Sequence, residues 1–425
     1  MPAESLNLVQ RWLGSQTAFS LLFVAVSIGV ILTAVAYLIY FERKISAWIQ
    51  DRYGPNRVGP LGLLQPLADG LKFFLKEDFT PPRVDRWLFY LAPCIAFVVA
   101  LVGFVVIPFG GWIHWPWAAP GERVAVQGAS LDIGVLYVLA IGSTAVYGVV
   151  LGGWASNNKY AFYGAMRSAA QMLSYEIPMG MAILVVILTT GALRLEGMVT
   201  AQQAGAWNVL LHPVAALFFG ITALAETNRA PFDLAEAEQE LVGGYHTEYS
   251  AMKLALFFLG EYAHLITACA MMTAMFLGGW EPLPFSRLLA GVPGLRVLHW
   301  ITVDPSWFAA LLRLAVFSGK IAFLIFVAMW LRWTLLRLRF DQLMRLAWQA
   351  LVPIGLVLVA VQGALLYRGT PAHWFSPLAE LATLAVAGWL GALGGRTITG
   401  RQSSLGAAAR DGGAASRTRS MAGAV

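Results

Sequence analysis

The 425-residue chain is poor in charge and in cysteine. Only 12% of its residues are Asp, Glu, Lys or Arg, 58% are hydrophobic, and the mean hydropathy is +0.67. Soluble domains carry about 25% charged residues, so this chain has too little polar surface to face water, and a lipid bilayer is its expected solvent. Its two cysteines, Cys94 and Cys269, each lie in an apolar run. That placement excludes a disulfide framework and an iron–sulfur spacing and predicts packing thiols.

Several motifs of catalytic and cofactor-binding proteins are also missing. The sequence has no GxGxxG, P-loop, His/Cys metal constellation or Ser-His-Asp arrangement with usable spacing. We therefore expect no redox centre in this chain, and a partner must bring any electrons. The N-terminus lacks a charged segment followed by a small-residue cleavage site, which predicts an uncleaved first span.

Long uncharged runs are abundant instead. Runs able to cross about 30 Å of hydrocarbon as helices predict nine membrane spans, or eight if the weak last run, which contains Glu380, does not span. The nine runs cover 19–41, 87–109, 131–153, 166–191, 209–226, 249–277, 307–331, 350–367 and 376–395. Strands of a membrane barrel would alternate over about ten residues. The predicted fold is therefore an all-α integral membrane protein, with a single bundle over residues 1–395.

Basic residues predict the orientation of this bundle. With the N-terminus outside, the cytoplasmic loops cover about 42–86, 154–167, 226–253 and 332–349 and contain sixteen Lys and Arg residues, against six on the other side. Nine spans place the Gly-, Ala-, Ser- and Arg-rich tail, 396–425, in the cytoplasm. We expect that basic tail to be disordered and to touch anionic lipid head groups.

The longest predicted loop, 42–86, contains an amphipathic helix after Gly-Pro pairs at 54–55 and 59–60. The apolar stripe consists of Leu61, Leu64, Leu67, Leu71 and Leu75, and the opposite stripe consists of Gln65, Asp69, Lys72 and Lys76. Such a helix lies along the membrane interface. It either anchors the chain to head groups or forms a wall of a cavity open to the membrane. The "GPNRVGP" stretch and the interleaved acids and bases favour the cavity.

Acidic residues are concentrated in the stretch "NRAPFDLAEAEQE", residues 228–240. In a helix, Asp233, Glu236 and Glu240 share one face at i, i+3 and i+7. Glu238 points elsewhere. Like charges at this spacing repel one another, which favours the binding and cooperative exchange of protons. A solvated acidic face is the alternative.

Further carboxylates lie within or at the ends of the neighbouring spans. They are Glu176, Glu226, Glu248 and Glu261. Glu261 is thirteen residues beyond Glu248, about 20 Å deeper in a helix. An uncompensated charge at that depth costs about 2.5–3.5 kcal/mol. These residues therefore predict a polar interior with an ion or proton path, with partnered structural carboxylates as the alternative.

Two histidines and a proline also lie in or beside the spans that contain these carboxylates. Pro178, two residues after Glu176, frees a backbone carbonyl and creates a polar notch in its helix. His264 lies one turn from Glu261, and His212 precedes Pro213. Each histidine is a candidate either for packing or for proton transfer. The GxxxG pairs Gly148/Gly152 and Gly391/Gly395 predict close helix packing.

The chain resembles a known family in three stretches: "ERKISAWIQDRYGPNRVGPLGLLQPLADGLK", "GWASNNKYAFYGAMRSAAQMLSYEIPMG" and "AETNRAPFDLAEAEQELVGGYHTEYSAMKLALFFLGEY". They resemble the H subunits of bacterial respiratory complex I, NADH:quinone oxidoreductase, which are homologous to subunit 1 of mitochondrial complex I. The resemblance is dense over about 40–265 and looser to about 370. The tail after 395 has no counterpart in it.

This resemblance implies a membrane subunit of a proton-pumping NADH:quinone oxidoreductase in the cell inner membrane. Such a subunit admits ubiquinone or menaquinone at its interface and has no covalently bound cofactor and no metal. Flavin and iron–sulfur clusters belong to partner subunits. The implied partners are the hydrophilic arm, docked through the cytoplasmic loops, the antiporter-like and small membrane subunits, lipid and quinone, with no nucleic acid.

The resemblance also implies roles for individual residues. The quinone entry and chamber would involve Arg43, Arg52, Asp69, Lys72, Arg229 and Asp233. The path coupling quinone reduction to proton translocation would consist of Glu176, Glu226, Glu236, Glu238, Glu240, Glu248 and Glu261. The alternative is the membrane subunit of an energy-converting hydrogenase or formate hydrogenlyase, which matches "GPNRVGP" and "GWASNNKY" less well. A stand-alone ion transporter is disfavoured by the missing internal repeat and by the large loops on one face.

Overall fold

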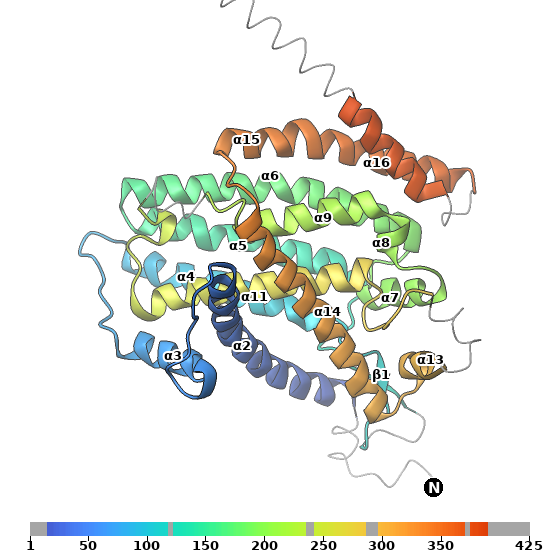
Figure 1. Ribbon diagram of the computed structural model, residues 1–425, viewed down its shortest axis with the longest axis horizontal. Helices are drawn as coiled ribbons and strands as arrows, with labels where there is room; N and C mark the ends of the chain where they lie inside the picture. The colour runs from blue at the N-terminus through green and yellow to red at the C-terminus, as the bar shows by residue number, and fades with distance from the viewer. Residues whose placement is uncertain (1–14, 118–121, 235–241, 286–295, 370–374, 390–425) are drawn as a thin grey trace, which may run out of the picture.

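The computed structural model describes residues 15–117, 122–234, 242–285, 296–369 and 375–389, and these form an almost entirely helical bundle (Figure 1). The α-helices are α2 (Gln16–Ile49), α3 (Gln65–Leu75), α4 (Arg86–Val102), α5 (Gly134–Ala155), α6 (Lys159–Thr190), α7 (Leu195–Ala204), α8 (Asn208–Leu211), α9 (Pro213–Glu226), α11 (Ala251–Phe276), α13 (Arg296–Val303), α14 (Trp307–Thr334), α15 (Phe340–Arg345) and α16 (Val352–Tyr367). Residues 375–389 are helical as well.

Short elements connect these helices. The 3-10 turns are η2 (Pro60–Gly62), η3 (Gly103–Val106) and η4 (Gly244–His246), and η5 (Leu346–Leu351) is a π-helix. Strands β1 (Trp112–Ile113) and β2 (Val124–Ala125) pair antiparallel, with Trp112 opposite Ala125. This small ribbon lies at one end of the bundle, beside the N-terminal end of α14 (Figure 1).

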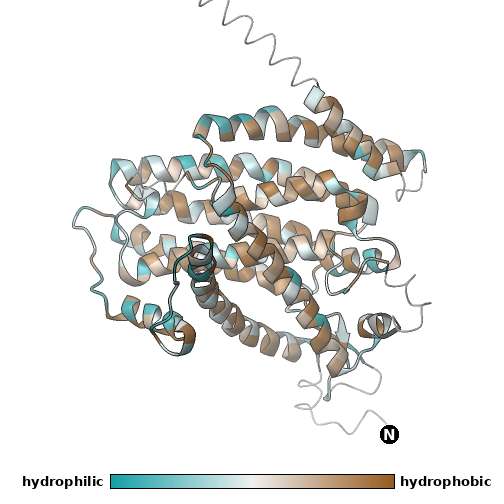
Figure 2. Ribbon diagram, in the orientation of Figure 1, coloured by the Kyte–Doolittle hydropathy of each residue, from teal (hydrophilic) through white to brown (hydrophobic). Residues whose placement is uncertain are grey.

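Seven helices among the described residues are long and apolar enough to cross a membrane, which confirms the predicted all-α membrane fold. They are α2, α4 with η3, α5, α6, α11, α14 and the continuous stretch Phe340–Tyr367. Figure 2 shows apolar residues along these helices and hydrophilic residues at many of their ends and on α3. The seven helices coincide with seven of the nine predicted runs.

The other two predicted runs look different. At 209–226 the chain forms the separate helices α8 and α9, because His212 leaves the helical conformation (φ −132°, ψ 63°) and Pro213 starts α9. With 14 residues, α9 is about 21 Å long, shorter than the hydrocarbon layer. The last run, 376–395, is helical to residue 389, and its remainder lies outside the described residues, as does the tail 396–425. The number of spans therefore stays a prediction.

Local sequence signals set the ends of the central helix α6. The side chain of Asn158 accepts a hydrogen bond from the Tyr160 amide at 3.0 Å and caps the first turn. Gly191 ends the helix in the left-handed conformation, at φ 68°, which glycine adopts without steric cost. Between these ends α6 crosses the bundle and packs against α5, α9 and α16.

Close packing around α5 and α11 builds the core. A Cβ atom at Gly148 would lie 3.0 Å from the Cβ of Ala96 on α4, and one at Gly152 would lie 3.2 Å from Phe257 on α11. Small residues here thus let α4, α5 and α11 approach one another, as the GxxxG pair predicts. Gly391 and Gly395 lie outside the described residues.

The first predicted loop, residues 42–86, is partly helical and is hydrogen-bonded to α2. Helix α2 continues to Ile49, so Glu42 and Arg43 occupy helical positions rather than a loop. The Tyr40 hydroxyl donates a hydrogen bond of 2.7 Å to the Leu61 carbonyl. Gly62 has a φ of 83°, and a Cβ there would lie 2.1 Å from the Pro55 carbonyl oxygen. The "GPNRVGPLG" turn therefore folds tightly against α2 and directs α3 along its side (Figure 1).

Candidate functional site

A cavity of about 580 Å³ lies between α2, α3, α11 and the end of α14. Apolar side chains form much of its wall, among them Phe73, Phe74, Phe258 and Leu259. Its polar lining comes from the last turns of α2 and the turn that follows, from α3, from the middle of α11 and from the end of α14. These polar residues are Glu42, Arg43, Ser46, Arg52, Asp69, Tyr262 and Arg332. The cavity therefore combines an apolar body with a strongly charged border.

Glu42 is the centre of this charged border. Its side chain is buried and accepts hydrogen bonds from Arg229 at 3.2 Å, from the Tyr262 hydroxyl at 2.7 Å and from Arg332. The partners come from the segment after α9, from α11 and from α14, so four separate parts of the chain meet at one carboxylate. Such convergence compensates a charge that would be costly to bury alone.

Arg229 extends this cluster inward. Its guanidinium group is buried, lies 4.3 Å from the ring centroid of Tyr262, and its Nε is 3.5 Å from Oε1 of Glu261. Burial by itself would lower the pKa of Arg229, but the charges of Glu42 and Glu261 outweigh it and raise the pKa above its ordinary value. Arg229 is therefore a permanent positive charge shared between a carboxylate at the cavity and one deeper in the bundle.

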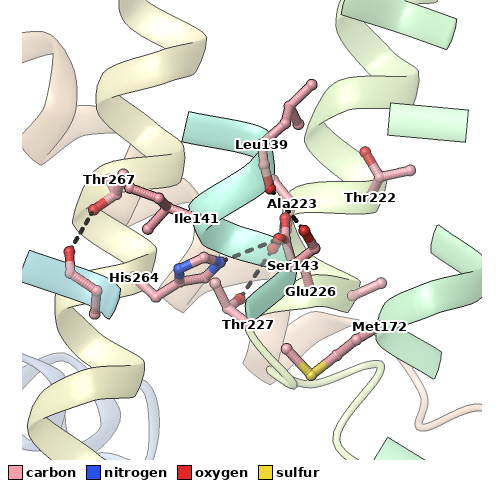
Figure 3. Close-up of polar contacts among 12 residues, drawn as sticks. Leu139, Ile141, Ser143, Met172, Thr222, Ala223, Glu226, Thr227, His264 and Thr267 are labelled. Atoms are coloured by element: carbon pink, nitrogen blue, oxygen red, sulfur yellow. Dashed lines mark hydrogen bonds and ion pairs between the residues drawn. The ribbon is translucent and has the colours of Figure 1, made fainter. Parts of the chain in front are cut away.

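A second polar group lies next to Glu261. His264 of α11 points toward Glu226, at the end of α9, with Ser143 of α5 beside the pair (Figure 3). Nε2 of His264 is 3.4 Å from Oε1 of Glu226. Glu176 on α6 lies near enough to Glu226 for their charges to interact. A cavity of about 50 Å³ is lined by Glu226, Glu261 and His264 together.

The other residues predicted from the sequence fall in three places. Arg43 donates a 2.8 Å hydrogen bond to Asp69, across the cavity from α2 to α3. Lys72 is exposed on α3 and is not among the residues that line the cavity. Asp233 pairs with Arg337 at 3.4 Å, outside the Glu42 cluster.

The remaining predicted acidic residues are Glu248, which the structure describes, and three glutamates that lie outside the described residues. Glu248 accepts a 2.7 Å hydrogen bond from Asn158 at the start of α6, and therefore connects two of the loops that the sequence predicts to be cytoplasmic. Glu236, Glu238 and Glu240, the densest part of the acidic stretch, lie outside the described residues. Of the predicted acids, Glu226 and Glu261 thus line one cavity, with Glu176 near Glu226, while Asp233 and Glu248 have partners of their own.

Sequence reasoning missed three members of the site, Glu42, Tyr262 and Arg332, and it also missed Arg337, the partner of Asp233. Glu42 and Arg332 both sit next to long apolar runs, where they resemble ordinary loop charges. The usable signal is their position inside helices: a charge within the last turns of a span must find a partner. Their partner could not be read from the sequence, since Arg332 and Glu42 are 290 residues apart.

Among the described residues, no group of three His, Cys, Asp or Glu side chains is arranged to hold a metal ion. Cys94 is exposed and Cys269 is buried, and both are free thiols.

Comparison with known proteins gives consistent matches. The family described as NADH dehydrogenase matches residues 22–363. An NADH-quinone oxidoreductase H subunit of Geobacter metallireducens is 47% identical over 343 residues, which are 81% of this chain and 95% of that protein. The NADH-quinone oxidoreductase H subunit of Wolbachia pipientis is 48% identical over 359 residues, 83% of this chain and 97% of the relative. The protein of the same name from Rickettsia canadensis is 48% identical over 347 residues, 81% and 92% of the two chains. The family match includes every residue of the two cavities.

Proposed function

Because this chain belongs to the NADH dehydrogenase family and is a membrane subunit of NADH-quinone oxidoreductase, we propose that the cavity between α2, α3, α11 and α14 admits quinone from the bilayer. The other subunits of that enzyme complex are its partners, and the chain spans the bacterial inner membrane. This membership selects the oxidoreductase over the hydrogenase-type complex and the stand-alone transporter that the sequence left open. Flavin and iron–sulfur clusters in partner subunits would deliver electrons from NADH.

The cavity suits an amphipathic ligand such as quinone. Its volume of about 580 Å³ lies within the range of about 300–1,000 Å³ that small-molecule sites have. Phe73, Phe74 and Phe258 offer apolar contacts for an isoprenoid tail, and Arg43 and Arg52 bring N–H donors for the quinone carbonyl oxygens. On α3, Leu67, Leu71 and Leu75 are exposed. They form the apolar stripe that we expect to lie among lipid tails beside the quinone entry.

One observation carries the proposal: Glu42 borders the cavity and shares Arg229 with Glu261. Reduction of a quinone consumes two electrons and two protons and yields the quinol. Electrons that arrive before protons make the head group negative, and this charge competes with Glu42 for the guanidinium groups of Arg229 and Arg332. When the ion pair between Arg229 and Glu261 weakens, the proton affinity of Glu261 rises. Reduction of the quinone thereby leads to uptake of a proton by Glu261.

The coupling path then runs inward through carboxylates. Glu261, Glu226 and Glu176 follow one another from the cavity into the bundle. Glu236, Glu238, Glu240 and Glu248 remain proposed members at the loop side of the path, as Lys72 and Asp233 remain proposed members of the quinone entry. The path would lead to the proton-pumping membrane subunits, where protons cross.

The test is Glu261→Gln in the complete complex, reconstituted in vesicles. We expect normal assembly, NADH oxidation with a hydrophilic acceptor within about twofold of the native complex, and quinone-linked proton pumping reduced at least about tenfold. Glu196→Gln is the matched control, because Glu196 is a half-buried glutamate on α7, at the opposite end of the bundle from α3 (Figure 1). Normal pumping by an assembled Glu261→Gln complex would remove Glu261 from the path. Loss of assembly would favour a structural role.

A further inference from the structure

The two carboxylate groups of the proposed path meet at one small cavity. Glu261 belongs to the cluster at the quinone cavity through Arg229, whereas Glu226 contacts His264 and interacts with Glu176. A proton crosses the gap between two carboxylates only through water or through a side chain that can both take it up and release it. The junction therefore needs such a group between Glu261 and Glu226.

His264 occupies this junction. It follows Glu261 by three residues on α11, so both side chains lie on the same face of the helix. Both residues line the cavity of about 50 Å³, and Glu226 lines it from α9. A cavity must offer about 10–15 Å³ to hold a water molecule, so this one has room for water between Glu261 and the imidazole ring.

The Nε2 atom of His264 is aimed at Glu226. It is buried, lies 3.4 Å from Oε1 of Glu226, and has no hydrogen bond of good geometry among the described residues. Figure 3 shows the ring pointing from α11 across to the end of α9. Space around the pair is tight on the α5 side: a Cβ atom at Gly142 would lie 3.3 Å from the Glu226 carboxylate and 3.9 Å from the His264 ring. The ring thus faces a single carboxylate at short range.

We infer that His264 carries the proton between Glu261 and Glu226, an inference that rests on the proposed coupling function. Protonated Glu261 gives its proton through cavity water to the imidazole and remains as a carboxylate beside Arg229. The imidazolium, next to the Glu226 carboxylate, then donates the proton from Nε2 to Oε1 of Glu226. The ring returns to neutral, and Glu226 holds the proton next to Glu176 and Ser143. Each transfer moves one proton and leaves no unpaired charge.

Histidine suits this role better than a third carboxylate. Its ordinary pKa of about 6.5 allows the ring to gain and lose a proton near neutral pH. The charged groups that face or adjoin it are Glu226 from α9, Glu261 from its own helix, Glu176 from α6, and Arg229, which holds Glu261. Three acids and one arginine favour a positive charge on the ring at the moment of transfer.

The test is His264→Gln in the complete complex. Glutamine retains an N–H donor near the position of Nε2 and can keep a hydrogen bond to Glu226, but it cannot carry a proton. We expect normal assembly, acceptor-linked NADH oxidation within about twofold of native, and quinone-linked pumping reduced at least about fivefold. We also expect the pH profile of quinone reduction to lose its limb near neutral pH. Thr267→Val is the matched control: Thr267 lies one turn further along α11 and bonds only backbone carbonyls, those of Ala100 and Ala263.

The possible results distinguish failure of the His264 inference from failure of the proposed coupling function. Full pumping and an unchanged pH profile in His264→Gln, with pumping lost in Glu261→Gln, would overturn the role of His264 and leave the proposed path intact. Full pumping in both variants would overturn the path itself. If His264→Gln does not assemble, His264→Asn is measured instead. Pumping by an assembled Asn complex at the native rate contradicts the inference, and loss of pumping supports it.

Discussion

At the scale of single residues, Glu42 and Arg229 depend on each other. Both are buried, and each contacts further charges: Glu42 contacts Arg332, and Arg229 contacts Glu261. Removal of one partner of a buried ion pair leaves an uncompensated charge, which costs more than the pair itself contributes. The cluster is therefore stable only as a whole.

Replacement of Arg229 by leucine tests this dependence. Arg229→Leu leaves Glu42 with Arg332 and the Tyr262 hydroxyl, and Glu261 without its ion-pair partner, and we expect destabilisation of about 3–5 kcal/mol. Thermal denaturation of the purified complex should show it as a lower transition temperature, together with lost quinone reductase activity. Because Arg194 is half exposed and faces Asp132 at 3.5 Å, the control Arg194→Leu should change stability by less than about 0.5 kcal/mol. Equal effects of the two replacements would contradict a cooperative buried cluster.

The sequence predicted part of this site. Arg229 and Glu261 stand out because charges are rare in this chain and both interrupt apolar surroundings. Glu42 does not stand out, since it is followed directly by Arg43 and Lys44 and resembles the ordinary charged end of a span. Its importance comes from burial, and burial depends on how α11 and α14 pack against α2.

At the scale of elements, α9 is an apolar helix too short to be counted among the seven candidate spans. It is short, and its N-terminal end is enclosed by the protein. The carboxylate of Glu380, from the helical residues 375–389, accepts hydrogen bonds from the amides of Val214 at 3.0 Å and Ala215 at 3.3 Å. Its other oxygen is 2.7 Å from Nδ1 of His212. Glu380 thus supplies from a distant helix the cap that α9 lacks in its own sequence.

Glu380→Ala should loosen this end of α9. Two backbone amides and His212 would lose a buried acceptor, and we expect destabilisation of about 1–3 kcal/mol. Glu380→Gln keeps one acceptor oxygen and should cost less than the alanine variant. Thermal denaturation of the complex measures both, with the half-exposed Leu381→Ala as control. The cap would be refuted by an alanine variant as stable as the control.

The sequence marked Glu380 as a weakness of the last predicted span, and the structure assigns the residue a partner instead. The amphipathic α3 is a different case, since its two stripes are local and could be read directly over residues 65–75, although Leu61, predicted in the same apolar stripe, lies in η2 before the helix begins. Its polar face carries Asp69 to the cavity, and its leucines remain exposed. A helix of this kind is predictable because its pattern repeats every turn, whereas a cap supplied by a distant helix leaves no local pattern.

At the scale of the whole molecule, the chain is a subunit of an enzyme complex, and its described part offers a cavity and buried titratable side chains. We expect the chain reconstituted alone in vesicles to show no proton or cation flux above that of empty vesicles, under an imposed gradient and with added quinol. The native complex containing the chain should contain flavin and iron–sulfur clusters and should pump on addition of NADH and quinone. Measurable flux through the isolated chain would return the stand-alone transporter to consideration.

The sequence by itself determined the solvent, the helical class and most of the membrane helices. These properties depend on composition and run length, because a backbone in hydrocarbon must satisfy its hydrogen bonds within its own helix. The family could also be recognised from the sequence, through three stretches that contain charged residues. Polar residues are few in such a chain, so their order along the chain is specific to the family.

Only the tertiary structure decided which charges meet. Glu42 and Arg229 are 187 residues apart, and Glu380 and His212 are 168 apart. No local periodicity encodes these pairs, since the choice of neighbours in a bundle is made by side-chain packing over entire helix faces. Glu42, Glu226 and Glu261 come together because α2, α9, α11 and α14 pack around one another, and Arg229 and Arg332 compensate the buried charge of Glu42.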